Sequence, residues 1–224
     1  LSFNELHQKL EKVRNNFDNL SINRSDPVAI VLPNGPDLGF LFIACSCFAI
    51  SAPLNPNYSK NEFKFYLSDL KAKFLIVDPD LKTEASKAAF ELGITIINLS
   101  FEQNIGSLKF TKNNGDSLIK TTNDYENDTS LLLHTSGTTS KPKLVQLSSN
   151  NLIKSSLNIG KTLYLSEEDS CLNIMPLFHI HGLVAVLLTS LVHNIKLVCT
   201  SGFNALNFYK FLQDFKPSWY SGVP

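Results

Sequence analysis

Residues 27–32 read Pro27-Val28-Ala29-Ile30-Val31-Leu32, an apolar run that ends at the turn signal Pro33-Asn34-Gly35-Pro36. A short run without polar alternation is typical of a strand that is buried on both faces of a sheet. Before it, residues 4–19 carry apolar side chains at spacings of three and four, which predicts an amphipathic helix. After it, residues 37–50 are apolar almost throughout and predict a buried helix. The chain therefore opens as a helix, a strand and a helix.

The same alternation continues to the end of the chain. Further helices are predicted at residues 59–71, 81–92, 149–162, 182–193 and 204–215, and further strands at 73–78, 93–98, 130–134, 144–147, 171–175, 195–200 and 219–223. A polar connection at residues 104–128 carries one short strand near 108–111. Strands that alternate with helices are typical of a parallel sheet covered by helices. The predicted fold class is α/β, with parallel, helix-covered sheet subdomains.

Composition excludes several classes of function. The 20 basic and 20 acidic residues give a net charge of zero, and only Arg14 and Arg24 are arginines, so no basic surface for nucleic acid is expected. No apolar stretch reaches the roughly 20 residues that a membrane-spanning helix needs. The four cysteines form no C-x-x-C pair and are expected to be buried thiols in a reducing compartment: Cys45, Cys47, Cys171 and Cys199.

The ends of the chain suggest that it is a piece of a longer protein. It begins at Leu1 rather than at a methionine, and it stops at Ser221-Gly222-Val223-Pro224, directly after a predicted strand.

One loop has the composition of a polyphosphate site. Thr135-Ser136-Gly137-Thr138-Thr139-Ser140-Lys141-Pro142-Lys143 follows a predicted buried strand. Glycine lets the backbone come close to a ligand, hydroxyl groups can donate to phosphate oxygens or bind a cation, and Lys143 can neutralise charge. The loop lacks the Gly-Lys-Ser/Thr ending of the P-loop, which excludes the P-loop NTPases. An ordinary hydroxyl-rich turn is equally compatible with this composition.

The loop resembles the phosphate-binding signature of the AMP-forming adenylating enzymes, which include acyl-CoA synthetases, luciferases and peptide-synthetase adenylation domains. Most members have glycine where this chain has Ser140, and the fungal and plant oxalate–CoA ligases are similar to it at that serine. Four further stretches are similar to the same branch: residues 33–36, 52–58, 62–71 and 175–183. The resemblance spans the chain from Leu1 to Pro224, which would form part of the N-terminal AMP-binding domain of an adenylate-forming enzyme.

The resemblance implies an acid–thiol ligase. Such an enzyme activates a carboxylate with ATP to an acyl-adenylate and pyrophosphate, and then transfers the acyl group to CoA with release of AMP. ATP, CoA and a small carboxylic acid would be substrates, with Mg²⁺ as the bridging ion and Thr139 as the hydroxyl nearest to it. The implied phosphate-binding residues are Thr135, Ser136, Gly137, Thr138, Thr139, Ser140 and Lys143.

Two histidines stand two residues apart in the stretch 175–183. If this stretch is extended, His179 and His181 face the same side. Three interpretations stay open: a metal site that would need a third ligand, two histidines bonded to backbone groups, or the acyl pocket that the resemblance implies. In that last case His179 would form the wall of the pocket and Phe178 and His181 its floor. A histidine-lined pocket suits a small dianion such as oxalate, because a carboxylate needs hydrogen-bond donors.

His134 is expected to be a strand-end histidine, and it has no assigned role.

Several functions remain possible at this stage. Oxalate is the expected acid; a medium-chain or aryl acyl-CoA synthetase, a peptide-synthetase domain and a non-catalytic nucleotide-binding fragment are alternatives. The family's adenine- and ribose-binding residues, its metal-binding glutamate and its adenylation lysine would follow Pro224, so the 224 residues alone are expected to be inactive. A peroxisomal or cytoplasmic location is expected, with any peroxisomal address also beyond Pro224.

Overall fold

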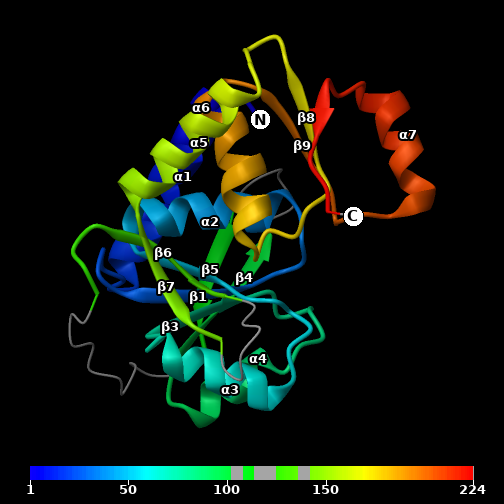
Figure 1. The fold of residues 1–224 in the computed structure, drawn as a ribbon. Helices are drawn as coiled ribbons and strands as arrows, with labels where there is room; N and C mark the ends of the chain where they lie inside the picture. Colours follow the sequence, from blue (N-terminus) through cyan, green and yellow to red (C-terminus); the bar gives the residue numbers. More distant parts are fainter. Residues whose placement is uncertain (102–107, 114–124, 136–141, 224) are drawn as a thin grey trace. The chain divides into compact units, whose positions relative to one another are not determined.

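The computed structural model describes residues 1–101, 108–113, 125–135 and 142–223. The chain divides into two compact units. The first unit comprises residues 1–33 and 41–146, and the second unit comprises residues 34–40 and 147–224. Each unit contains a sheet with parallel strands (Figure 1).

The larger sheet has seven strands in the order β5-β4-β3-β1-β2-β6-β7. Their bounds are β1 Pro27–Val31, β2 Ile50–Pro53, β3 Phe74–Val77, β4 Thr95–Phe101, β5 Leu108–Lys112, β6 Thr129–His134 and β7 Leu144–Ser148. The pairs β1–β2, β1–β3, β2–β6 and β3–β4 are parallel, and β5 runs antiparallel to β4. The predicted parallel α/β class is therefore confirmed, and β5 is an antiparallel strand at one edge.

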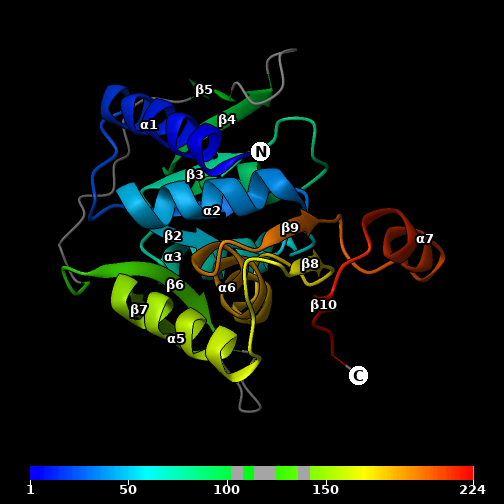
Figure 2. The same cartoon turned by 90° about the horizontal axis from the view of Figure 1, so that it is seen from above.

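Helices cover both faces of this sheet (Figures 1 and 2). They are α1 (Phe3–Asn19), α2 (Pro36–Phe48), α3 (Lys60–Asp69) and α4 (Ala85–Glu91). Side chains of α3 and α4 pack with Ala29 and Val31 of β1 in one buried cluster, whereas α1 and α2 lie on the opposite side. Because successive side chains of a strand alternate between faces, Val28 and Ile30 bury themselves on that opposite side, and all four side chains are fully buried.

Strand β2 was not expected from the sequence. The predicted helix at residues 37–50 ends at Phe48, and Ile50–Pro53 forms a strand between β1 and β6. The backbone N–H of Ile50 donates to the Asp26 carbonyl at 3.0 Å, and that of Leu54 donates to the Ile30 carbonyl at 2.9 Å. Residues 38–59, which contain the end of the helix and the whole strand, carry no charged side chain, so no change of hydropathy marks the boundary between helix and strand.

The second unit contains a three-stranded parallel sheet in the order β10-β8-β9. Its strands are β8 (Ser170–Asn173), β9 (Lys196–Cys199) and β10 (Trp219–Tyr220). Its helices are α5 (Ser149–Thr162), η1 (His181–Leu188), α6 (Thr189–Val192) and α7 (Ala205–Phe215). The helix predicted at 182–193 is present, but its first eight residues, η1, are a π-helix.

The cysteines only partly match the expectation. All four are free thiols, and Cys45 and Cys171 are buried, but Cys199 is half-buried and Cys47 is exposed. The expectation of four buried thiols is therefore wrong for Cys47, because this residue lies near the end of α2 at an exposed position of the helix. Among the described residues, no helix has both the length and the apolar character that a membrane crossing requires.

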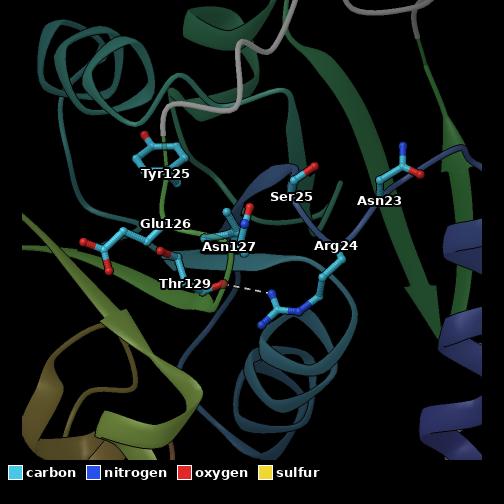
Figure 3. Close-up of a pocket in the computed structure, with 8 residues that line it drawn as sticks. Asn23, Arg24, Ser25, Tyr125, Glu126, Asn127 and Thr129 are labelled. Carbon is cyan, nitrogen blue, oxygen red and sulfur yellow. Dashed lines mark hydrogen bonds between the residues drawn. The ribbon is translucent and has the colours of Figure 1, made fainter.

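Arg24 connects the segment before β1 to the strands beside it. Its Nη1 donates to the carbonyl oxygen of Thr129 at 2.9 Å (Figure 3). Nη1 also donates to the carbonyl oxygen of Ala49, and Nη2 donates to Ser130 Oγ at 2.7 Å. Thr129 and Ser130 are buried. A guanidinium suits this position because it offers several donors in a fixed plane.

We predict that Arg24→Met lowers the free energy of unfolding by about 3 kcal/mol, because three acceptors lose their donor and two lie in a buried strand. Arg14→Met is the matched control, since the side chain of Arg14 is 57% exposed on α1. Chemical denaturation of the full-length protein measures the free energy of unfolding of both variants. Equal midpoints for the two variants would contradict the assigned role of Arg24.

Candidate functional site

The sheet of the first unit brings the carboxyl ends of its parallel strands to one edge. Ligands of open α/β sheets bind at this edge, because loops and helix N-termini meet there. The segment that leaves β6 at this edge begins with Thr135, the first residue of the predicted phosphate loop. The predicted phosphate loop therefore begins at the edge of the sheet where ligands of such folds bind.

Thr135 and Lys143 hold the two ends of the loop together. The Thr135 N–H donates to the Lys143 carbonyl at 2.9 Å, and the Lys143 N–H donates to Thr135 Oγ1 at 3.2 Å. Both residues are exposed. The Thr135 hydroxyl uses an oxygen lone pair in this contact, so its proton is free to be donated to an anion.

The other predicted phosphate-binding residues lie outside the described residues. These are Ser136, Gly137, Thr138, Thr139 and Ser140. Their role, including the Mg²⁺ assignment of Thr139, stays a prediction.

His134 has partners that the sequence did not indicate. Its Nε2 lies 2.8 Å from Asp69 Oδ2 at the end of α3, and its ring meets the edge of Tyr66 at a centroid distance of 4.7 Å. Asp69 precedes His134 by 65 residues, so no local pattern could reveal the pair.

The predicted acyl-pocket residues lie in the second unit: Phe178 and His179 are in the turn between β8 and η1, and His181 is the first residue of η1. The Phe178 and His179 rings are 4.7 Å apart, and His181 Nε2 lies 2.7 Å from Ser221 Oγ. The His179 N–H donates to the Pro176 carbonyl at 3.3 Å, and the Leu183 N–H donates to the His179 carbonyl at 3.1 Å. The stretch is thus a turn that leads into a helix, and the expectation for an extended chain does not apply.

The two histidines consequently have different surroundings. His179 is exposed and packs on Phe178, and the partial burial of its ring lowers its pKa below the ordinary value. His181 is half-buried and hydrogen-bonded to Ser221. Within the described ranges, no three histidine, cysteine, aspartate or glutamate side chains are grouped to hold a metal ion, so the zinc interpretation gains no ligand set there.

Asn34 is a positioning residue that the sequence analysis did not single out. Its Oδ1 accepts from the Leu177 N–H at 2.7 Å, and its Nδ2 donates to the Thr200 carbonyl at 3.0 Å. It thereby joins the turn before Phe178 to the end of β9 in the second unit. The only signal in the sequence was its place in the Pro-Asn-Gly-Pro turn.

A cavity of about 390 Å³ opens at the other edge of the larger sheet (Figure 3). Its lining residues lie in the segments before β1 and β6 and at the first residues of β2 and β6: they are Asn23, Arg24, Ser25, Ile50, Tyr125, Glu126, Asn127 and Thr129. The amino ends of the strands border this cavity. It is therefore separate from the edge at which Thr135 lies.

Gly182 allows η1 to begin directly against the turn. A Cβ atom at this position would lie 2.3 Å from the Pro176 carbonyl oxygen, far inside any normal contact. The π-helix and the turn that carries Phe178 and His179 can therefore approach each other only with glycine here.

We predict that Gly182→Ala lowers the thermal midpoint of the full-length protein by several degrees, because the backbone at Pro176 must move. The control is Gly222→Ala, where the nearest atom to an added Cβ is Ile174 Cδ1 at 4.0 Å. Differential scanning calorimetry measures both variants. A midpoint for Gly182→Ala that equals that of the control would show that the close approach does not exist in solution.

The chain is similar to a known protein family and to several known proteins. The family described as AMP-binding enzyme matches residues 1–224. A probable CoA ligase, CCL9, of Humulus lupulus is 38% identical over 99% of this chain and 44% of its own length. Oxalate–CoA ligases of Arabidopsis thaliana and Saccharomyces cerevisiae are both 34% identical, over 100% and 91% of this chain and 45% and 42% of their own lengths. The chain thus spans less than half of these curated relatives.

Solved structures show the same fold. The o-succinylbenzoate CoA synthetase (MenE) of Bacillus subtilis, in complex with the acyl-adenylate intermediate OSB-AMP, has a TM-score of 0.80 at 25% identity and is covered over 56% of its chain. Apo MatB of Rhodopseudomonas palustris has a TM-score of 0.80 at 21% identity and is covered over 44% of its chain. Both alignments cover 100% of this chain. The chain belongs to the family of AMP-binding enzymes.

Proposed function

We propose that the complete protein is an AMP-forming acid–thiol ligase with oxalate as its acid. The carboxylate oxygen attacks the α-phosphorus of ATP and pyrophosphate leaves; the CoA thiolate then attacks the acyl carbon and AMP leaves. One observation carries this proposal. Three relatives that match 91–100% of the chain at 34–38% identity are named as CoA ligases, one of them as a probable one, and two of the three are oxalate–CoA ligases.

The contact between Thr135 and Lys143 supports the first half-reaction. Phosphoryl and adenylyl transfers depend on positioning and on neutralising charge on the phosphate oxygens. Thr135 and Lys143 are exposed at the carboxyl edge of the sheet, where a hydroxyl and an ammonium group can reach the β- and γ-phosphates. The hydroxyls between them would donate to the same oxygens. Mg²⁺ bound to ATP would neutralise part of the charge, with Thr139 as its nearest protein hydroxyl.

The turn between β8 and η1 supports a small acid. His179 offers an imidazole N–H at an exposed position, and His181 is oriented by its contact with Ser221. These donors suit a carboxylate better than an alkyl chain. Phe178 supplies the apolar surface against which His179 packs.

An aryl acid is the second candidate. A 4-coumarate–CoA ligase of Petroselinum crispum is 28% identical over 96% of this chain, and the MenE complex holds an aromatic acyl-adenylate. The Phe178 ring offers a surface on which an aromatic acid could stack.

We predict that the full-length protein releases pyrophosphate with ATP, Mg²⁺ and CoA when oxalate is supplied, and much more slowly with acetate, octanoate or coumarate. A coupled pyrophosphate assay over the four acids measures this. Preference for coumarate would favour the aryl candidate and refute oxalate. No release with any acid would refute the ligase and favour a non-catalytic nucleotide-binding protein.

We predict that Lys143→Ala slows acid-dependent pyrophosphate release by about 10²- to 10³-fold, because one cation near the phosphates is lost. Lys154→Ala, on the exposed face of α5, is the control and should leave the rate within about twofold. Rates at saturating acid and CoA compare the two variants. An unchanged rate for Lys143→Ala would remove this lysine from the site.

A further inference from the structure

The end of α3 is joined to the strand that precedes the phosphate loop. Asp69, the last residue of α3, lies 2.8 Å from the Nε2 atom of His134, the last residue of β6. Both residues belong to the first unit. The contact therefore links a helix on one face of the sheet to the carboxyl edge at which the loop begins.

The pair holds the His134 ring in a defined place. The His134 side chain is only 7% exposed, whereas that of Asp69 is 42% exposed. Tyr66 meets the ring edge-on at 4.7 Å, and Phe65 lies 6.2 Å away. Tyr66 is itself stacked on Tyr58 at 4.6 Å. Aromatic rings and a carboxylate thus enclose the imidazole, which limits the ways in which it can turn.

Asp69 occupies an unfavourable position for a carboxylate. The C-terminus of a helix carries partial negative charge, and a basic group is favoured there over an acidic one. The last turn of α3 contains no basic residue. His134 supplies the donor that compensates for this position, which indicates that the carboxylate serves the contact with the histidine rather than the helix.

The end of α3 that carries Asp69 is held by a second hydrogen bond. Leu70, which caps α3, accepts a hydrogen bond at 2.8 Å from the hydroxyl of Tyr125, a residue of the segment before β6. The segment before β6, through Tyr125, and the last residue of β6, His134, therefore both bond to the end of the same helix. A shift of β6 along its axis would break both contacts.

The residue after His134 is Thr135, which is bonded to Lys143 through two hydrogen bonds. Any displacement of His134 is passed directly to Thr135 and, through these bonds, to Lys143. Groups that bind phosphate must be held to fractions of an ångström to be effective. The contact of Asp69 with His134, the residue next to Thr135, is a side-chain contact that could impose this precision on the start of the loop.

We propose that Asp69 and His134 are positioning residues for ATP: their contact sets the position of Thr135 and Lys143 and so determines the affinity for the ATP phosphates. This proposal rests on the proposed function only in taking ATP as the ligand. The pair does not touch the reacting atoms. Because variants of the pair keep the Lys143 ammonium and the loop hydroxyls and change only how these groups are aligned for binding, loss of the pair should raise KM for ATP much more than it lowers kcat.

Kinetics of the full-length enzyme test the proposal. Asp69→Asn keeps the size of the side chain and removes its charge, and His134→Gln removes the imidazole; each should raise KM for ATP about tenfold, the equivalent of one charge-assisted hydrogen bond. KM for the acid and for CoA should stay within about twofold. The double variant should be no worse than the worse single variant, because both remove one shared contact. Asp18→Asn, on the exposed surface of α1, is the matched control and should leave every constant unchanged.

A purely structural role predicts a different result. If the pair only stabilises the fold, the variants lower the thermal midpoint and the fraction of active enzyme, which reduces the apparent kcat while KM for ATP stays at the wild-type value. That result would overturn the proposal. Asp69→Glu retains a carboxylate, and it should recover part of the lost ATP affinity if positioning is the role.

Calorimetric titration of the same proteins with MgATP alone separates this proposal from the proposed function. Weaker ATP binding by Asp69→Asn and His134→Gln supports the positioning role even if the wild-type protein turns over none of the acids. Equal ATP affinity of wild type and variants overturns the role even if the protein proves to be an oxalate–CoA ligase. Failure of the wild-type protein to bind ATP overturns it as well.

Discussion

Parallel pairing of buried strands is the constraint on which the first unit depends. Strand β2 pairs with β1 on one side and with β6 on the other, and all three run in the same direction. The direction of β6 places Thr135 at the carboxyl edge of the sheet, where open α/β sheets bind ligands. Arg24 joins the segment before β1 to the first residues of β6, which aligns the strands at their amino ends.

The order of elements could be predicted from the sequence, but one strand could not. Apolar runs such as 27–32 and 73–78 differ clearly from the helical patterns beside them, and they form β1 and β3. Strand β2 follows α2 after a single residue within one charge-free stretch, so periodicity offers no boundary. The missed strand is the one that joins β1 to β6, and hence the arrangement of the loop edge became visible only in the structure.

The residues of the candidate site could likewise be predicted only in part from the sequence. The phosphate-loop signature is local, so Thr135 and Lys143 could be predicted from the sequence as its two ends, and they are bonded to each other; their binding of phosphate stays a prediction. Contacts between distant residues could not be predicted. Asp69 and His134 are 65 residues apart, and Asn34 reaches Leu177 across 143 residues. A single sequence records the chemistry of such side chains but not their proximity. The start of a π-helix at His181 was equally hidden, because it depends on the close approach of Gly182 to Pro176.

Formation of an acyl-adenylate is the central step of the proposed reaction, because it distinguishes AMP-forming ligases from ligases that split ATP into ADP and phosphate. Mass spectrometry of the full-length protein incubated with ATP, Mg²⁺ and oxalate, without CoA, tests it most directly. We expect an oxalyl-adenylate and an equal amount of pyrophosphate, followed by conversion to AMP and a CoA thioester when CoA is added. Formation of ADP and inorganic phosphate, with no adenylate, would contradict it.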